Sequence, residues 1–360
     1  MSEEYITPEI TPSSNEEKHS VEPGFRKVCT RIGLMIIVIF GARIAAELLA
    51  VPLGNWLAEL DSFAFYLFNA FYSCLFLYAV PIVATVFILR RPLKNSPNKV
   101  YQKPKYFGKA MAMFPAGYGL AITVRLLTML LSMLFKGTAL GDSFNVVQDS
   151  LFSASDISTA LIQFVQLAII APVFEELWFR GLVMESLRPY GNGFAIFVSA
   201  ILFGLTHANL EQFFYATALG IFLGYIAIAT ESIVTTTIMH AIFNSLSGFM
   251  LLLSVEPSVQ DYILGASNGQ GTEAEITPFV VLYFAWTVLI MLLLVVGIIM
   301  MIAKFIKIKK YKVPKMQTEL SAGKRWKIFF TRASVIVGLI LAVIIFMKPV
   351  IVSAIVQAFE

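Results

Sequence analysis

The sequence EELWFRG, residues 175–181, decides the fold, because it places two acids and an arginine in a segment otherwise apolar enough to enter a bilayer. An ionised side chain at the centre of a spanning helix costs about 2.5–3.5 kcal/mol on insertion scales, so it persists where it is paired, faces a polar cavity or serves in chemistry. Glu176 and Arg180 are four residues apart and share a helix face. Glu175 is turned by about 100° from Glu176 and has no such partner, so its role needs a chemical explanation.

The composition is that of a polytopic membrane protein. Of the 360 residues, 58% are hydrophobic and only 14% are charged, far from the averages of soluble domains. The two cysteines, Cys29 and Cys74, provide neither a disulfide framework nor a CxxC metal motif. The net charge of +4 is spread over loops that face lipid headgroups, so membrane lipids are expected partners and nucleic acid is not.

The predicted fold class is all-α, a polytopic bundle of about nine transmembrane helices. Each predicted span needs about 20 apolar residues. The spans are expected at about 32–53, 63–89, 110–135, 157–188, 193–208, 212–229, 232–254, 279–303 and 334–357.

The loop charges predict the orientation of these spans. Segments 90–109 and 304–332 are rich in Lys and Arg, whereas segments 137–156 and 255–277 contain acids and no Lys or Arg. Because basic loops are retained in the cytoplasm, the first two segments and the N-terminus are expected on the cytoplasmic side. All four long loops then carry the charge that their side requires.

Four regions are predicted along the chain. Residues 1–30 are polar and rich in Glu, Ser and Pro, which is typical of a disordered tail rather than a cleavable signal. Residues 31–155 hold the N-terminal spans, 156–255 the core with the acidic motif, and 256–360 the C-terminal spans with a basic cytoplasmic loop.

Other charged residues lie within the predicted spans. Arg43 and Glu47 are four residues apart, which favours an ion pair within the first helix. Arg125 and Lys348 have no partner nearby in the sequence, so they are expected to bond carbonyls or acids of neighbouring helices or to extend toward an interface. In the sixth span, small residues recur every four positions, which predicts close packing against another helix; they are Ala216, Gly220 and Gly224.

Two of the three histidines, His207 and His240, lie in apolar segments after the acidic motif. A single intramembrane histidine is more often a structural hydrogen-bonding group than a ligand. Together with Glu175, however, the pair offers three ligands for zinc with an open fourth position for water.

The depths of these residues allow one polar cluster. At 1.5 Å per residue, Glu176 lies ~18 Å before the turn at 189–193, His207 lies ~21 Å after it, and His240 lies ~14 Å into its own helix. Phe203 and Asn244 share helix faces with His207 and His240 respectively, because each pair is four residues apart.

These residues resemble the CAAX-protease and bacteriocin-processing family of intramembrane endopeptidases, over about residues 160–255. Three family motifs occur in order on three apolar segments: EExxxR with Glu175, Glu176 and Arg180, FxxxH with Phe203 and His207, and HxxxN with His240 and Asn244. One departure is Glu231, where relatives often carry Gly in the turn before the seventh span.

The resemblance implies a set of roles. Glu175 and His207 would activate water for amide hydrolysis, while His240 and Asn244 would stabilise the oxyanion. If a metal is bound, zinc is the expected ion, with Glu175, His207 and His240 as its ligands. Structural support would come from Glu176, Arg180 and Phe203.

The resemblance further implies a multi-pass protein of the bacterial plasma membrane that cleaves a membrane-associated peptide or protein, with or without a lipid group. Two other functions stay open. One is a non-catalytic bacteriocin-immunity or scaffolding protein that retains the polar cluster. The other is a transporter, against which the sequence offers no internal repeat. The oligomeric state is not predicted by the sequence.

Overall fold

The computed structural model describes residues 21–58, 61–93, 102–136, 156–267, 275–306 and 320–348, together with Thr138, Gly141, Ala154 and Ile351. Within these residues the secondary structure is helical throughout, with short turns between the helices. This confirms the all-α fold class. The first part of the chain forms α1 (Val21–Ala58), α2 (Ser62–Ser73), η1 (Cys74–Ala79), α3 (Val80–Leu93), α4 (Phe107–Met111) and α5 (Phe114–Met133).

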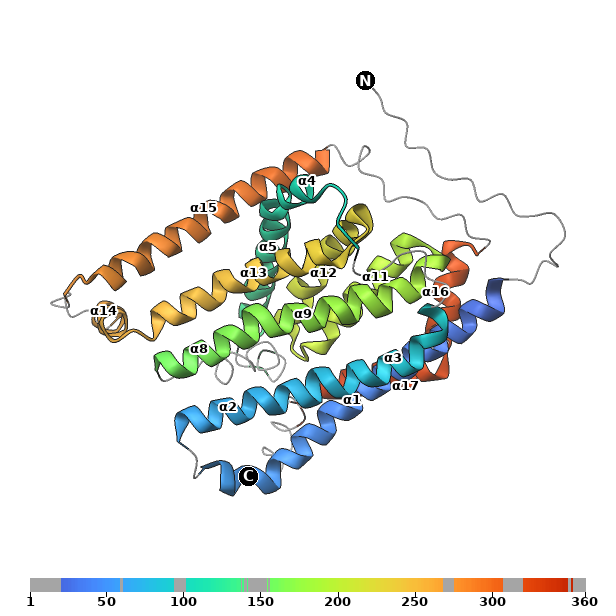
Figure 1. Ribbon diagram of the computed structural model, residues 1–360, viewed down its shortest axis with the longest axis horizontal. Helices are drawn as coiled ribbons and strands as arrows, with labels where there is room; N and C mark the ends of the chain where they lie inside the picture. The colour runs from blue at the N-terminus through green and yellow to red at the C-terminus, as the bar shows by residue number, and fades with distance from the viewer. Residues whose placement is uncertain are drawn as a thin grey trace.

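The central part of the chain carries the motifs. One long helical run contains α8 (Ile157–Val165), η2 (Gln166–Ile170), α9 (Ala171–Glu175), η3 (Glu176–Met184), α10 (Glu185–Leu187) and the 3₁₀ turn η4 (Arg188–Tyr190). It is followed by α11 (Asn192–Thr206), α12 (Leu210–Thr230) and α13 (Ile233–Ser254). The remaining helices are α14 (Pro257–Ser267), α15 (Pro278–Ile306), α16 (Ala322–Phe330) and α17 (Ala333–Phe346) (Figure 1).

The expectation of about nine spans is corrected by helix lengths. Among the described residues, seven helices are long and apolar enough to cross a membrane, and α16 with α17, bent by 69°, would make an eighth. The predicted fifth span is α11, which has only 15 residues. At 1.5 Å per residue it rises ~22 Å, less than the ~30 Å hydrocarbon core. The predicted range 193–208 is similarly short.

The N-terminal boundary also differs from the prediction. Helix α1 begins at Val21, so residues 21–30 are helical and their assignment to a disordered tail was wrong. Glu22 explains the early start, because its carboxylate bonds Arg26 four residues later and pairs with Lys324 of α16. Residues 1–20 lie outside the described residues, as do most of the predicted loop 137–156 and residues 307–319 of the predicted loop 304–332.

Helix α12 lies between two hydrophobic clusters. Ala216, Ala227 and Ile228 belong to the cluster built around α1, η3 and α11, whereas Leu219 and Leu223 belong to the cluster with α5 and α13. Small residues allow this close packing. A side chain at Gly220 would meet the backbone of Ala200 on α11, and one at Gly224 would meet Ile196. The predicted small-residue packing is thus confirmed.

The isolated charges of the spans find partners on other helices. Arg125 pairs with Glu211 at 2.9 Å and Lys348 pairs with Glu47 at 2.7 Å, which confirms bonding to neighbouring acids. Arg43 does not follow the prediction of an ion pair within its helix. Its guanidinium donates to the carbonyl of Thr206 at the end of α11. Helix-to-helix contacts therefore override the i,i+4 preference at this site.

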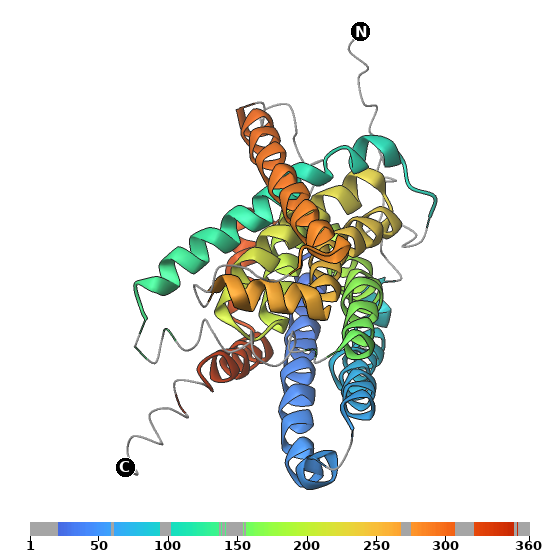
Figure 2. The ribbon, with the colours of Figure 1, turned by 90° about the vertical axis from the view of Figure 1, so that its left-hand side faces the viewer.

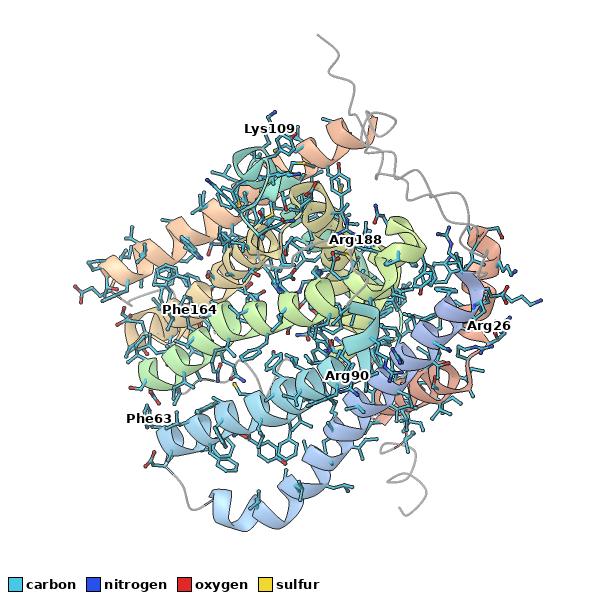
Figure 3. All side chains as sticks on the ribbon, turned by 45° about the vertical axis from the view of Figure 1, so that its right-hand side comes forward. Arg26, Phe63, Arg90, Lys109, Phe164 and Arg188 are labelled. Carbon is cyan, nitrogen blue, oxygen red and sulfur yellow. The ribbon has the colours of Figure 1, made fainter. Side chains whose placement is uncertain are left out.

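The basic ends of several helices gather at one end of the bundle. Figure 3 shows Arg26, Arg90 and Arg188 toward one side and Phe63 and Phe164 toward the other. Lys109, at the end of the predicted basic segment 90–109, lies apart from these arginines, and the orientation of the segments stays a prediction.

The turn between α12 and α13 contains Glu231, the departure from the family pattern. Its backbone is left-handed, with φ 51° and ψ 31°. Glycine adopts this conformation without the steric cost that a Cβ brings, which explains why it suits the turn. Here Lys105 pairs with the Glu231 carboxylate at 3.0 Å, and Gln102 donates to the Glu231 carbonyl. The segment just before α4 therefore holds the strained residue.

Candidate active site

The long helical run that carries the acidic motif departs from regular α geometry just before Pro172. Segment η2 is π-helical, and Ala171 N–H bonds the carbonyl of Gln166, five residues back. Continued in that pattern, the carbonyl of Leu167 would need an N–H from Pro172, which has none. Asn244 on α13 supplies the missing donor, since its side-chain amide bonds the Leu167 carbonyl at 2.8 Å. A proline on one helix thus explains the position of an asparagine on another.

A fully buried ion pair braces the next turn. Arg180 Nη1 lies 2.8 Å from Glu176 Oε1, and both side chains are 0% exposed. The other end of the guanidinium donates to the carbonyl of Gly220 on α12 at 3.2 Å. Gly220 lies on the face of α12 that packs closely on α11, where a Cβ would meet Ala200 and Phe203. The pair therefore joins the motif helix to the packing stripe.

His240 connects the two acids. Its Nδ1 lies 3.0 Å from Glu176 Oε1, and its Nε2 lies 3.6 Å from Glu175 Oε2. Since the carboxylate paired with Arg180 can only accept a hydrogen bond, Nδ1 of His240 carries a proton. In the neutral imidazole, Nε2 then presents a lone pair toward the same space as Glu175.

Glu175 differs from Glu176 in exposure and partners. Its side chain is 13% exposed, whereas that of Glu176 is 0% exposed. The hydroxyl of Tyr78 donates to Glu175 Oε1 at 3.1 Å, leaving Oε2 on the side of His240. Among the described residues, no arginine pairs with Glu175, which lies at the less enclosed edge of the cluster.

Phe203 is the apolar centre of the site. Its ring lies edge-on to His207 and His240, with centroid distances of 5.1 and 5.6 Å, and the Arg180 guanidinium lies over its face at 4.7 Å. His207 Nδ1 contacts the Phe203 carbonyl at 3.0 Å. The FxxxH spacing therefore sets one aromatic ring between both histidines.

The predicted site residues are brought together to different degrees. Glu175, Glu176, Arg180 and His240 form a continuous set of contacts, and Phe203 with His207 borders it. Asn244 lies on the same face of α13 as His240, and its amide donates a hydrogen bond to the Leu167 carbonyl of η2. The predicted residues from three helices thus lie close together, while the role of each residue stays a prediction.

The arrangement does not form a three-ligand metal site. Among the residues that the structure describes, no group of three His, Cys, Asp or Glu side chains is placed to hold a metal ion. One feature that accompanies metal-ligating histidines is present, because Nδ1 of His240 is held by a carboxylate. The expectation of bound zinc stays a prediction.

Sequence reasoning missed two polar contributors from the N-terminal helices. Tyr78 contacts Glu175, and Arg43 holds the Thr206 carbonyl next to His207. The sequence shows each of them as a polar residue within an apolar span. That pattern does not indicate which residue of another helix it contacts.

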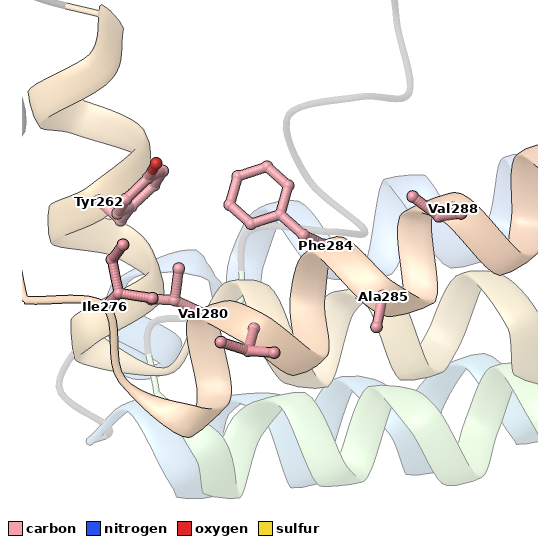
Figure 4. A pocket seen from close by; sticks show the side chains of 7 residues that line it. Tyr262, Ile276, Val280, Phe284, Ala285 and Val288 are labelled. Carbon is pink, nitrogen blue, oxygen red and sulfur yellow. The ribbon is translucent and has the colours of Figure 1, made fainter.

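A separate hollow of about 530 Å³ lies between α14 and α15, and Figure 4 shows the side chains that line it. Its lining is aliphatic and aromatic, with the Tyr262 hydroxyl as its one polar side-chain group. Helix α15 lies at the periphery in both ribbon views (Figure 1; Figure 2). This hollow offers no acid or base for chemistry, so the candidate active site is the cluster around Glu175.

Comparison with known proteins agrees with the motif positions. Residues 157–246 match the family model described as type II CAAX prenyl endopeptidase Rce1-like. A relative from Bacillus subtilis (strain 168), named "Putative membrane peptidase YdiL", is 29% identical over 97 residues, which cover 27% of this chain and 38% of that protein. No solved structure matches the chain. The matched segment contains all seven residues of the three motifs.

Proposed function

We propose that this chain, which belongs through residues 157–246 to the CAAX-protease and bacteriocin-processing family, is an intramembrane endopeptidase. Its substrate would be a peptide bond in a membrane-associated peptide or protein, with or without a lipid group. The family match and the membrane peptidase relative support a membrane protease at the level of the family. The catalytic assignment rests on this chain's own geometry.

The observation that carries the proposal is the 3.6 Å separation of Glu175 Oε2 and His240 Nε2. Two acceptors this close can bind the two hydrogens of one water molecule, each at about 2.8 Å. Glu175 would take a proton from that water while the water oxygen attacks the peptide carbonyl carbon. The tetrahedral intermediate then breaks its C–N bond, and the proton held by Glu175 passes to the leaving amine.

The other residues would assist this reaction. We assign His207 to the activation of water together with Glu175. Asn244 would stabilise the oxyanion with its second amide hydrogen, because the first is used by Leu167. His240 would hold the water by accepting a hydrogen bond at Nε2, whereas holding the oxyanion would require a proton on Nε2; Glu176 and Arg180 keep its ring oriented.

Mass spectrometry of membrane peptides tests the proposal. Cells that express the wild type should contain cleavage products that disappear in Glu175→Gln. The matched control is Glu47→Gln, which removes an acid from another apolar helix. Glu47 is far from Glu175 in the sequence and pairs with Lys348. Identical peptides in the wild type and Glu175→Gln, at equal protein levels, overturn the assignment.

A second function is favoured by one observation. The polar groups of the cluster largely bind one another, since Glu176 contacts both Arg180 and His240 and Asn244 caps a free carbonyl. A cluster whose members contact one another in this way would also suit a non-catalytic immunity or scaffolding protein. In that case Glu175→Gln would keep the protective or binding phenotype, whereas an endopeptidase would lose it.

We further propose that the basic segments and the N-terminus face the cytoplasm of a bacterial plasma membrane, with lipids as partners and no nucleic acid. The charge distribution supports this orientation. A cysteine placed at position 97 should react with an impermeant reagent only after the cells are opened. Labelling from outside intact cells contradicts this topology.

A further inference from the structure

Tyr78 lies outside the segment that matches the family, yet it contacts the proposed catalytic acid. It is part of η1, the π-helical segment between α2 and α3. Its hydroxyl donates to Glu175 Oε1 at 3.1 Å, and its ring stacks on Phe174 at 5.7 Å with an angle of 17°. Two contacts therefore fix both ends of this side chain against α9. Figure 1 shows the α2–α3 run lying beside the α8–α9 run.

A carboxylate at the end of a glutamate side chain needs such a contact to keep one orientation. Its terminal torsion joins an sp³ to an sp² carbon and has broad, two-fold preferences. The Tyr78 hydroxyl holds Oε1, while Oε2 lies 3.6 Å from His240 Nε2. Rotation of the carboxylate would break the first contact and change the second. The hydroxyl thus determines which oxygen faces the space where water would bind.

We propose that Tyr78 is a positioning residue that orients Glu175 for attack by water, so that the N-terminal helices complete the active site. This inference rests on the proposed peptidase function. A misplacement of about 1 Å can lower a rate by about 10²-fold, because the reacting groups lose their alignment. The hydroxyl acts on orientation rather than on substrate affinity, so its loss lowers kcat and leaves KM unchanged.

The chain offers a matched control in the same helical run. Tyr72 donates its hydroxyl to the carbonyl of Ala46, at 2.5 Å, and so also bonds a neighbouring helix. Tyr72→Phe and Tyr78→Phe each remove one hydroxyl and one hydrogen bond, and both keep the ring. Only Tyr78→Phe removes a contact to Glu175. A general weakening of the helix contacts would affect both variants.

The experiment uses the full chain in vesicles of phosphatidylethanolamine and phosphatidylglycerol. The probe is a synthetic peptide that spans a cleavage site found to depend on Glu175 in the membrane-peptide comparison. Tyr78→Phe should lower kcat by about 10- to 100-fold at unchanged KM, whereas Tyr72→Phe should stay within about twofold of the wild type. The infrared carboxylate band that disappears in Glu175→Gln should shift in Tyr78→Phe and not in Tyr72→Phe.

The outcomes separate this inference from the function on which it rests. Equal product from the wild type and Glu175→Gln overturns the proposed function, and the inference falls with it. If Glu175→Gln is inactive but Tyr78→Phe matches Tyr72→Phe in kcat, the inference alone is overturned. An unshifted carboxylate band in Tyr78→Phe, or an equal loss of kcat in both tyrosine variants, also overturns it.

Discussion

Two acid–base pairs in apolar helices of this protein differ in almost everything except their chemistry. Glu176 and Arg180 are four residues apart and 0% exposed. Glu47 and Lys348 come from opposite ends of the chain and are 42% and 55% exposed. The first pair also contacts His240 and the Gly220 carbonyl, whereas the second joins α1 to the segment after α17.

Burial, rather than the presence of charge in an apolar segment, decides how much such a pair contributes to stability. Removing one partner of a buried pair leaves an uncompensated charge, which is costly, but an exposed pair contributes little. The buried pair also orients His240, so its value lies in arranging other groups. Four predictions follow the gradient from the buried cluster to the exposed pair.

The largest effect is expected for Glu175 and His207. Glu175→Gln and His207→Ala should each lower peptidase turnover by about 10²–10⁴-fold, because a missing acid–base group raises the reaction barrier. Both side chains are only partly enclosed, so the folded yield should stay near that of the wild type. Turnover on a verified substrate and the melting temperature are measured on the same samples. Wild-type turnover in both variants contradicts the assignment.

Glu176→Gln should act on stability. It leaves the Arg180 guanidinium buried without a counter-charge, which should cost about 3–5 kcal/mol of unfolding free energy. The matched control is Glu47→Gln, with an expected cost below about 1 kcal/mol. Denaturant unfolding in detergent measures both. Equal costs for the two variants would remove the distinction between the buried and the exposed pair.

Asn244 and His240 sharpen the description of the buried cluster. Asn244→Ala should lower turnover by about 10²–10³-fold if its amide stabilises the oxyanion. It should also cost about 1–3 kcal/mol of stability, because the Leu167 carbonyl loses its donor. His240→Ala distinguishes a hydrogen-bonding role of His240 from a role as metal ligand. Metal content falls in this variant only if His240 is a ligand. Metal content and single-turnover rates on the same samples decide, and unchanged rates in both variants refute the oxyanion role.

The smallest effect is expected for Lys348→Met. The substitution removes the exposed partner of Glu47, so the unfolding free energy should change by less than about 1 kcal/mol. Turnover should equal that of the wild type, because the pair contacts no residue of the proposed site. A loss above about 3 kcal/mol would mean that the pair behaves as a buried one.

Much of the site could be read from local spacing. The i,i+4 distance between Glu176 and Arg180 predicts their pair because both lie on one helix, and the structure contains it. The same rule failed for Arg43 and Glu47, which bond to Thr206 and Lys348 instead. The rule holds where the helix itself supplies the nearest partner and fails where another helix comes closer.

The sequence by itself determined the helical class, most helix positions and the three motifs, because apolar runs and spacings are local properties of the chain. Tertiary structure alone decided that Tyr78 reaches Glu175 and that Asn244 bonds the carbonyl left free by Pro172. These features depend on where helices far apart in sequence cross. A crossing is set by shape and by the few polar groups that must find partners in an apolar interior, and no single segment encodes it.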